Sequence, residues 1–405
     1  MIKSISKGYN RSQQSLRALP AGIWVLGFAS LFMDVSSELI HSLLPVFITT
    51  VLGASMITLG LVEGIAESTA AIVRVFSGVI TDYLRRRKFV LVLGYALGAI
   101  TKPIIPLASS ISWVFAAHFV DRMGKGIRGA PRDALVADIA PPPLRGAAYG
   151  LRQTLDSIGS FIGPSLALIM MLLLANDIRA VMWIAVIPAF FSVAILIFYL
   201  REPEQPVQRA SLTMAATLRF SFSGAKKLPG SYWLVVLLGA VFTLARFSEA
   251  FLILRAQDVG LSIAYVPLIM IVMNIFYAVF AFPAGAAADH FKYSNLLLIG
   301  IALLITADMV LAYAFTPFQA FIGAALWGLH MAFTQGLLSK LVADTAPEDL
   351  RGAAFGVFGL VTGTALLFAS ALAGFLWSIF GPSATFICGA AFATIAGAGL
   401  LAYRT

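Results

Sequence analysis

The chain has 405 residues, of which 60% are hydrophobic and 12% are charged, and its mean hydropathy is +0.92. These values lie outside the range of soluble globular proteins and exclude a water-soluble fold. A single cysteine, Cys388, excludes an internal disulfide and a cysteine metal cluster. The net charge of +9 would suit a nucleic-acid partner, but the positions of the basic residues along the chain indicate membrane topology instead.

Taken in chain order, twelve apolar segments are each long enough to cross about 30 Å of hydrocarbon as a helix. The first 20 residues are polar and basic, and we do not expect them to be a cleavable signal peptide. The only long polar connection, residues 201–230, follows the sixth segment. The predicted spans are residues 22–50, 57–82, 89–108, 111–138, 144–174, 179–200, 231–256, 264–289, 294–315, 317–345, 350–379 and 382–402.

Two segments of the first half recur in the second half. Residues 134–150 read ALVADIAPPPLRGAAYG, and residues 340–356 read KLVADTAPEDLRGAAFG. Upstream, GVITDYLRRRK is matched by GAAADHFKYS, so that Asp82 corresponds to Asp289. Two repeats at about half the chain length indicate a duplicated unit. We therefore predict an all-α membrane protein with 12 transmembrane helices in two pseudo-symmetric halves, residues 1–200 and 231–405, joined by a cytoplasmic linker, residues 201–230.

Lysine and arginine residues are concentrated at the amino terminus and in the loops that follow even-numbered spans, such as residues 85–88. The loops on the other side hold almost none, with Arg179 as the main exception. By the positive-inside rule, both termini are predicted to be cytoplasmic. We expect a multi-pass protein of the cytoplasmic (inner) membrane that contacts the lipid bilayer, acts as a monomer and binds no nucleic acid.

Charged residues at membrane depth are functional candidates because they are expensive to bury. Asp34, Glu38 and His41 are spaced to lie on one face of the first span, and Glu63 and Glu67 are spaced in the same way on the second. Because consecutive spans are antiparallel, Asp34 and Glu67 should lie at similar depth. The other candidates for proton coupling or substrate binding are Arg122, Arg152, Asp156, Arg246, Glu249, Asn274, Tyr277 and His330.

Three interpretations of the acidic residues are compatible with the sequence. Burial disfavours the charged form of a carboxylate, so these groups could bind and release protons during a transport cycle. Alternatively, Asp34, Glu38, His41, Glu63 and Glu67 could bind a divalent metal substrate such as nickel or cobalt, which accepts oxygen and imidazole ligands. A static network of ion pairs that holds the bundle together is the third interpretation.

Three short motifs resemble elements of the major facilitator superfamily. Residues Gly78, Asp82, Arg86 and Arg87 resemble its loop motif between the second and third spans, and Arg122 with Gly126 resembles its element on the fourth span. In the fifth span, Gly159, Gly163 and Pro164 resemble the element of drug/proton antiporters; their spacing allows close helix packing, and the proline favours a bend.

This resemblance implies a secondary transporter that works by alternating access of two six-helix halves. It also implies that Asp82 and Arg86, together with Gly78, Arg87 and the counterpart Asp289, form a conformational latch. No cofactor is expected. Because no G-x-x-x-x-G-K-[ST] nucleotide motif occurs and the fifth span holds no nucleophile–base pair, neither an enzyme nor an ATP-driven pump is expected.

The segments MDVSSELIH, LVEGIAE and RGAAYGLRQTLDSIG resemble a bacterial subgroup of facilitators that includes nickel- and cobalt-resistance permeases. The implied activity is proton-coupled efflux of a small solute, either an organic compound such as a drug or a divalent metal ion. Uptake of a small solute and a non-transporting receptor on the same fold are the alternatives.

Overall fold

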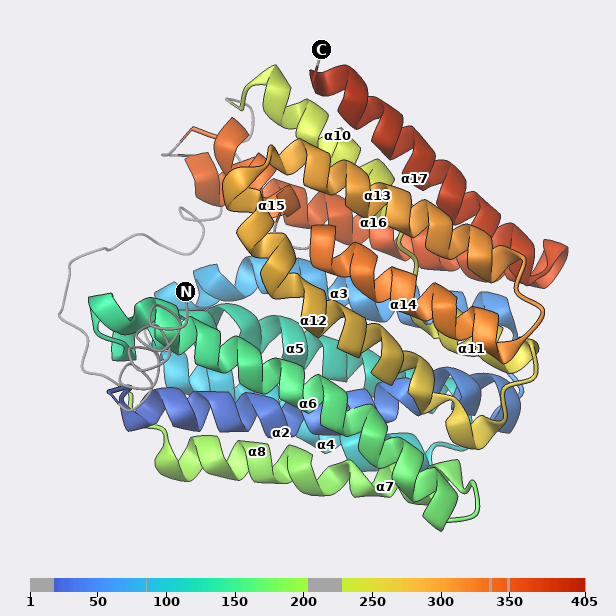
Figure 1. Cartoon of the computed structure of the whole chain (residues 1–405). Helices are drawn as coiled ribbons and strands as arrows, with labels where there is room; N and C mark the ends of the chain where they lie inside the picture. The colour runs from blue at the N-terminus through green and yellow to red at the C-terminus, as the bar shows by residue number, and fades with distance from the viewer. Residues whose placement is uncertain (1–17, 85, 203–227, 335–336, 348–349, 405) are drawn as a thin grey trace, which may run out of the picture.

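The computed structural model describes residues 18–84, 86–202, 228–334, 337–347 and 350–404. These residues form helices joined by short turns, and no strand occurs among them (Figure 1). The all-α prediction is confirmed. The helices follow the twelve predicted spans, and most of the predicted linker, residues 203–227, lies outside the described residues.

The first six spans form one group of packed helices. Helix α2 packs against α6 and α8, while α5 packs against both α3 and α4. The sixth span is divided at Ala185, whose carbonyl oxygen accepts a hydrogen bond of 2.7 Å from the Ser36 hydroxyl of α2. The elements are α2 (Ala21–Val46), η1 (Phe47–Val51), α3 (Met56–Leu84), α4 (Arg87–Leu107), α5 (Ile111–Ile139), η2 (Pro142–Leu144), α6 (Arg145–Leu173), α7 (Ile178–Ile184) and α8 (Val186–Tyr199).

The last six spans form a second group. Helix α14 packs against α12 and α13, and α17 packs against α10, α13 and α16. The seventh span is interrupted between α10 and α11, at residues 245–249. The elements are α10 (Gly230–Leu244), α11 (Ala250–Asp258), η3 (Ile263–Tyr265), α12 (Pro267–His290), α13 (Tyr293–Ala312), α14 (Pro317–Thr334), α15 (Leu337–Thr345), α16 (Arg351–Phe380) and α17 (Pro382–Arg404).

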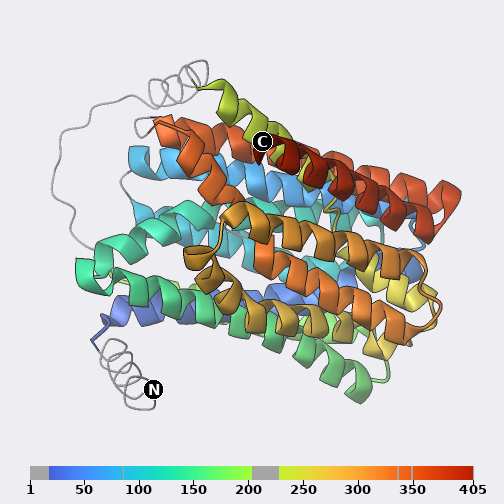
Figure 2. The same cartoon turned by 45° about the horizontal axis from the view of Figure 1, so that its top comes forward.

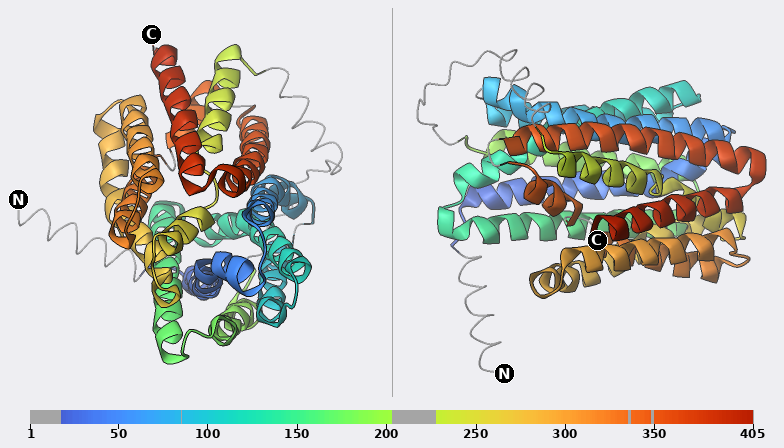
Figure 3. Two further views of the ribbon diagram at one scale, coloured as in Figure 1. Left: turned by 90° about the vertical axis from the view of Figure 1, so that its right-hand side faces the viewer. Right: turned by 90° about the horizontal axis from the view of Figure 1, so that it is seen from above.

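Among the described residues, the two groups meet mainly along three helix pairs. Helix α3 packs against α16, α6 packs against α12, and α2 packs against α11. The view along the helices shows the two groups side by side, with their helices running in the same general direction (Figure 3, left; Figure 2). We call the end of the bundle at which α2 and α10 begin the termini side, and the end at η1 and η3 the opposite side (Figure 1).

Apolar packing joins the two groups on the opposite side. There Leu43 and Phe47 belong to the same buried cluster as Phe251 and Leu254 of α11. A separate buried cluster, which includes Ile23 of α2, is built only from residues of the first group, near the termini side. The core is therefore continuous between the halves at one end of the molecule.

Nine helical segments of the described residues are long and apolar enough to cross a membrane. The other three predicted spans are α5, which carries many charged residues, the interrupted pair α10–α11, and the tenth span, of which α14 and α15 are the parts described on either side of residues 335–336. On the outer surface of α8, Ile187 is 73% exposed and Phe198 is 77% exposed, as expected for side chains that face lipid.

Candidate functional site

A cavity of about 530 Å³ lies between the two groups of helices. Its polar lining comes from both groups, including Glu67 of α3 and Arg122 of α5 on one wall and Asn274 of α12 on the other. A second hollow, of about 340 Å³, shares Glu38, Glu67 and Asp156 with the first. Arg74, whose side chain is 63% exposed, also lines this second hollow, which lies nearer the termini side than the main cavity.

Helix α6 approaches α2 very closely beside the acidic face of α2. A Cβ atom added at Gly159 or Gly163 would lie 2.7 Å from the carbonyl oxygen of Leu31 or Val35, respectively. Only glycine allows the two backbones to come this near. Glu38 and His41 of the α2 face line the main cavity, whereas Asp34 lines the second hollow.

Arg122 joins two of the predicted site residues. Its Nη1 atom lies 3.1 Å from Oε1 of Glu67, and its Nη2 atom donates to Nδ1 of His41 at 3.2 Å. Arg122 is only 4% exposed, and a guanidinium buried at membrane depth requires such partners. The structure therefore brings the first, second and fourth spans together at one buried cation.

A second buried ion pair lies next to Arg122 and involves the preceding residue of α5. Lys102 of α4 is 1% exposed, and its Nζ atom lies 2.8 Å from Oδ1 of Asp121 and 3.1 Å from the Ser37 hydroxyl. Asp121 precedes Arg122 on α5, so this pair fixes the helix that carries Arg122. Neither Lys102 nor Asp121 was predicted to be a coupling or binding residue. The adjacent opposite charges of Asp121 and Arg122 in an apolar span are nevertheless a recognisable signal.

Glu63 connects the two halves away from the cavity lining. It is fully buried, and its Oε2 atom accepts a hydrogen bond of 3.0 Å from the hydroxyl of Ser248, which lies between α10 and α11. Its Oε1 atom lies 3.6 Å from Nε2 of His118. This contact is a polar bridge between the halves at the divided seventh span.

The remaining acidic candidates of the first half lie nearer the termini side. Oδ1 of Asp34 is 3.8 Å from Nη2 of Arg128, whose guanidinium also lies over the ring of Tyr95. Oδ2 of Asp156 lies 3.2 Å from Nη1 of Arg152 and 3.6 Å from Nη1 of Arg132. Asp34 and Asp156 thus belong to ion pairs at the second hollow.

The interruption between α10 and α11 exposes four consecutive residues, Arg246 to Glu249, to the main cavity. Successive residues of a regular helix point about 100° apart, so an unbroken helix could not present all four to one space. Irregular backbone at membrane depth is tolerated where it lines a cavity. No carboxylate within ion-pair distance of Arg246 occurs among the described residues, and its buried Nε atom has no hydrogen-bond partner there.

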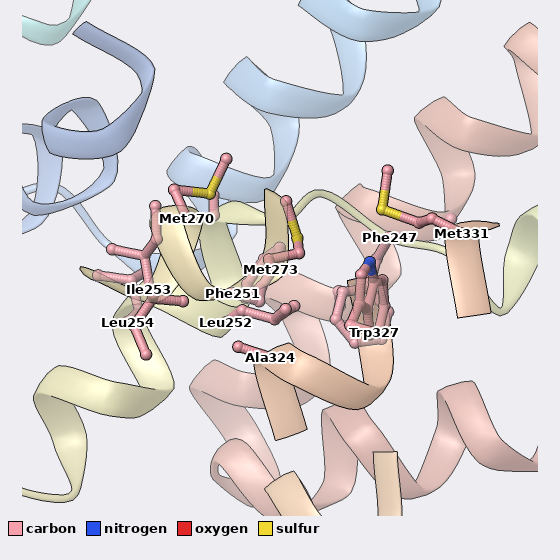
Figure 4. Close-up of a cluster of buried hydrophobic side chains, with 14 of the residues drawn as sticks. Phe247, Phe251, Leu252, Ile253, Leu254, Met270, Met273, Ala324, Trp327 and Met331 are labelled. Atoms are coloured by element: carbon pink, nitrogen blue, oxygen red, sulfur yellow. The ribbon is translucent and has the colours of Figure 1, made fainter. Parts of the chain in front are cut away.

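Much of the rest of the second-half wall is apolar. Met273, Trp327 and Met331 line the cavity beside Phe247 and lie in one cluster of buried side chains (Figure 4). Asn274 and Tyr277 also line the cavity, and Nδ2 of Asn274 donates to the carbonyl oxygen of Ser160 on α6 at 3.0 Å.

His330 is not among the residues that line the cavity. It is fully buried, with Nδ1 2.9 Å from the carbonyl oxygen of Gly300 and its ring 5.5 Å from that of Phe242. Its packing against these neighbours turns it away from the other candidates.

Similarity to known proteins shows the family to which the chain belongs. The family model described as Major Facilitator Superfamily matches residues 26–255 and 236–405. The chain belongs to the Major Facilitator Superfamily. An uncharacterised superfamily transporter of Methanocaldococcus jannaschii is 33% identical over 99% of this chain and 100% of its own length. The inner membrane transport protein YajR of Escherichia coli is 23% identical over 92% of this chain and 81% of its own length.

Solved structures of superfamily members share the fold. The crystal structure of a mutant of the nucleoside transporter NupG matches with a TM-score of 0.77 at 14% identity, covering 95% of this chain and 100% of that one. A bacterial homologue of the lysosomal transporter Spinster, in an inward-facing and unoccupied conformation, matches with a TM-score of 0.71 at 16% identity, covering 95% and 96%. The twelve-helix superfamily fold is confirmed, and the chain is a membrane transporter.

The residues of the superfamily loop motif lie at the termini side. Gly78 is on α3, and a Cβ atom added there would lie 3.6 Å from Ala130 of α5. Arg86 is exposed at the start of α4, and the following Arg87 forms an ion pair with Asp138 of α5. Asp82 and Asp289 lie on α3 and α12, but their side chains fall outside the described part of the structure.

The predicted metal ligands are divided between different environments. Glu38, His41 and Glu67 line the cavity, whereas Glu63 faces His118 and Ser248. Within the described ranges, no three side chains of histidine, cysteine, aspartate or glutamate are grouped closely enough to hold a metal ion. Residues that are already paired with arginine, such as Glu67, would have to exchange that partner to bind a cation.

Proposed function

We propose that the protein is a proton-coupled secondary transporter that exports a small organic solute across the cytoplasmic membrane by alternating access. The observation that carries this proposal is the Glu67–Arg122–His41 cluster in the wall of the cavity. Protonation of Glu67 would remove the charge that holds Arg122, so the binding of a proton would change the cavity lining. Asp34 beside Arg128 offers a second such pair.

The arrangement of the halves supports the same cycle. The apolar cluster on the opposite side closes the cavity there, while the second hollow leads toward the termini side. With the termini in the cytoplasm, as the basic loops predict, this is an inward-facing state. Opening to the other side would require the contacts between α2 and α11 to separate and the termini side to close, where Asp82, Arg86 and Asp289 would serve as the latch.

An organic solute fits the site better than a metal ion. The cavity volume of about 530 Å³ lies in the range of about 300–1,000 Å³ that is common for small-molecule sites. Its second-half wall offers methionine and aromatic side chains, and no metal-binding group of three ligands occurs among the described residues. Uptake by the same cycle is the second candidate, because alternating access is reversible.

The test uses proteoliposomes that contain a pH-sensitive dye, with a proton gradient imposed and substrates added singly. The panel contains nickel, cobalt, iron and a set of cationic and anionic drugs. We expect an organic compound to trigger proton flux, and we expect Asp34→Asn and Glu67→Gln to abolish it while the folded protein remains in the membrane. Asp177→Asn is the matched control, because Asp177 caps α7 away from the cavity and asparagine caps equally well. Wild-type flux in both cavity variants would exclude the coupling role.

A further inference from the structure

The buried basic groups of the first half are already neutralised by neighbours. Lys102 is paired with Asp121, Arg122 with Glu67, and Arg152 with Asp156. These cations are therefore held by the protein itself. A ligand that bound them would have to displace a carboxylate at close range.

Arg246 of the second half is different, because it faces the cavity without such a partner. Among the described residues no carboxylate lies within 4.0 Å of its guanidinium, and its Nε atom is buried without an acceptor. Its neighbour Phe242 offers a ring 5.9 Å away, which is a weak contact for a cation. The carboxylate of Glu249 lines the same cavity and acts on Arg246 from beyond ion-pair distance, so the guanidinium can still accept a closer negative charge from a ligand.

A second hydrogen-bond donor without an acceptor lies in the same wall. Trp327 is 1% exposed and lines the cavity, and its indole Nε1 atom has no hydrogen-bond partner in the described part of the chain. The ring of Trp327 lies 5.6 Å from that of Phe247, the residue next to Arg246. An indole nitrogen can only donate, and a buried donor normally has a partner. Each of the two side chains therefore holds a buried donor that has no acceptor among the described residues, and a small movement of the side chain would be needed to bring it to a ligand.

The surroundings define the rest of the ligand. Phe247, Met270, Met273 and Met331 line the same cavity as Arg246 and Trp327, and Figure 4 shows the four side chains in one buried cluster with Trp327. Methionine side chains adapt to ligands of different shape and make favourable contacts with aromatic rings. This wall suits an apolar or aromatic body that is attached to the anionic group.

From these observations we infer that the transported solute is an organic anion, with a carboxylate, sulfonate or phosphate group bound by Arg246 and Trp327 and an apolar body packed against the methionine wall. This inference rests on the proposed transport function, for which it names the substrate class. It concerns binding only and requires no proton gradient, so it can fail while proton coupling stands.

The test measures binding to the purified full-length protein in detergent by the shift of its melting midpoint. The probes are matched triads on two bodies: 1-naphthylacetate, 1-naphthylacetamide and 1-naphthylethylamine, and octanoate, octanamide and octylamine. We expect at least one carboxylate to stabilise the protein while its amide and amine do not. Stabilisation by the amides or amines alone, or by none of the six, would overturn the inference.

Three variants locate the anion site. Arg246→Gln should weaken carboxylate binding about tenfold or more, because it removes a charge-assisted hydrogen bond, and Trp327→Phe should weaken it by several-fold while the ring is kept. Arg201→Gln, at an exposed arginine beyond α8, is the control and should leave binding unchanged. Without ligand, Arg246→Gln should melt no lower than wild type, because among the described residues no carboxylate forms an ion pair with Arg246 and the buried guanidinium is costly to desolvate. Unchanged carboxylate binding in Arg246→Gln, or a lower melting midpoint in that variant without ligand, would contradict the assignment.

Discussion

The two halves share one architecture but differ in how many of their buried charges are paired. In the first half, most charges at membrane depth are paired, as in the 2.8 Å contact between Lys102 and Asp121. In the second half, Arg246 lines the cavity without an ion pair among the described residues, and both oxygens of the fully buried Asp308 lack hydrogen-bond partners there. The paired charges make the first half a defined scaffold, whereas unpaired charges are free to interact with a ligand or to change during the cycle.

The largest loss of stability should follow from breaking a buried ion pair of the first half. Asp121→Asn leaves Lys102 buried without its counter-ion, which typically costs about 3–5 kcal/mol. We expect this variant to lose much of its folded population, as measured by thermal unfolding in detergent. The double variant Lys102→Met with Asp121→Asn should recover most of the stability, because it removes both charges.

Arg74→Gln is the control for this experiment. The side chain of Arg74 is 63% exposed, and its ion pair with Asp133 should contribute at most about 1 kcal/mol. If Asp121→Asn and Arg74→Gln proved equally mild, the buried network would not be what stabilises the first half.

The second-largest effect should come from weakening the contact between α3 and α16, which joins the two halves at the opposite side. A Cβ atom added at Gly60 of α3 would lie 2.3 Å from the carbonyl oxygen of Ser370 on α16. Gly60→Ala should therefore destabilise the observed state by about 1–3 kcal/mol and raise the population open to the opposite side by about tenfold or more.

A cysteine at Met273, in a Cys388→Ala background, reports this opening. An impermeant maleimide added from the opposite side should label it faster in Gly60→Ala than in the parent. Gly146→Ala serves as the control, because no atom lies within 4 Å of a Cβ at that position. Equal labelling rates in all three proteins would show that the α3–α16 contact does not close this side.

Span positions could be predicted from the sequence because length and hydropathy are local properties. The span predicted at 57–82 is α3, Met56–Leu84, and the span predicted at 111–138 is α5, Ile111–Ile139. The interruption at residues 245–249 could not be predicted, because it depends on partners distant in the chain. Ser248 donates to Glu63, and its backbone nitrogen donates to Ser370, which lies on α16.

The choice of ion-pair partners was equally beyond the sequence. Depth alone places Asp34 near Glu67, but the rotation of each helix about its axis decides which side chains meet. In the structure Asp34 lies near Arg128, while Glu67 contacts Arg122. The charged character of the first-half cavity wall followed from composition, but its connectivity required the packed helices.

The smallest change in stability should come from replacing Asp308, a buried acid of the second half whose oxygens have no hydrogen-bond partner among the described residues. Asp308 on α13 packs near Gly389 of α17 and behind Phe247, and burying a polar group without a partner costs about 1–3 kcal/mol. Asp308→Val, which is similar in volume, should raise the melting midpoint by a few degrees. Asp121→Val is the matched comparison and should lower it. A lower melting midpoint in Asp308→Val would mean that the carboxyl group contributes to folding. A higher midpoint together with lost transport would mean instead that Asp308 meets a partner in another state of the cycle, which would make the second half an active participant in coupling.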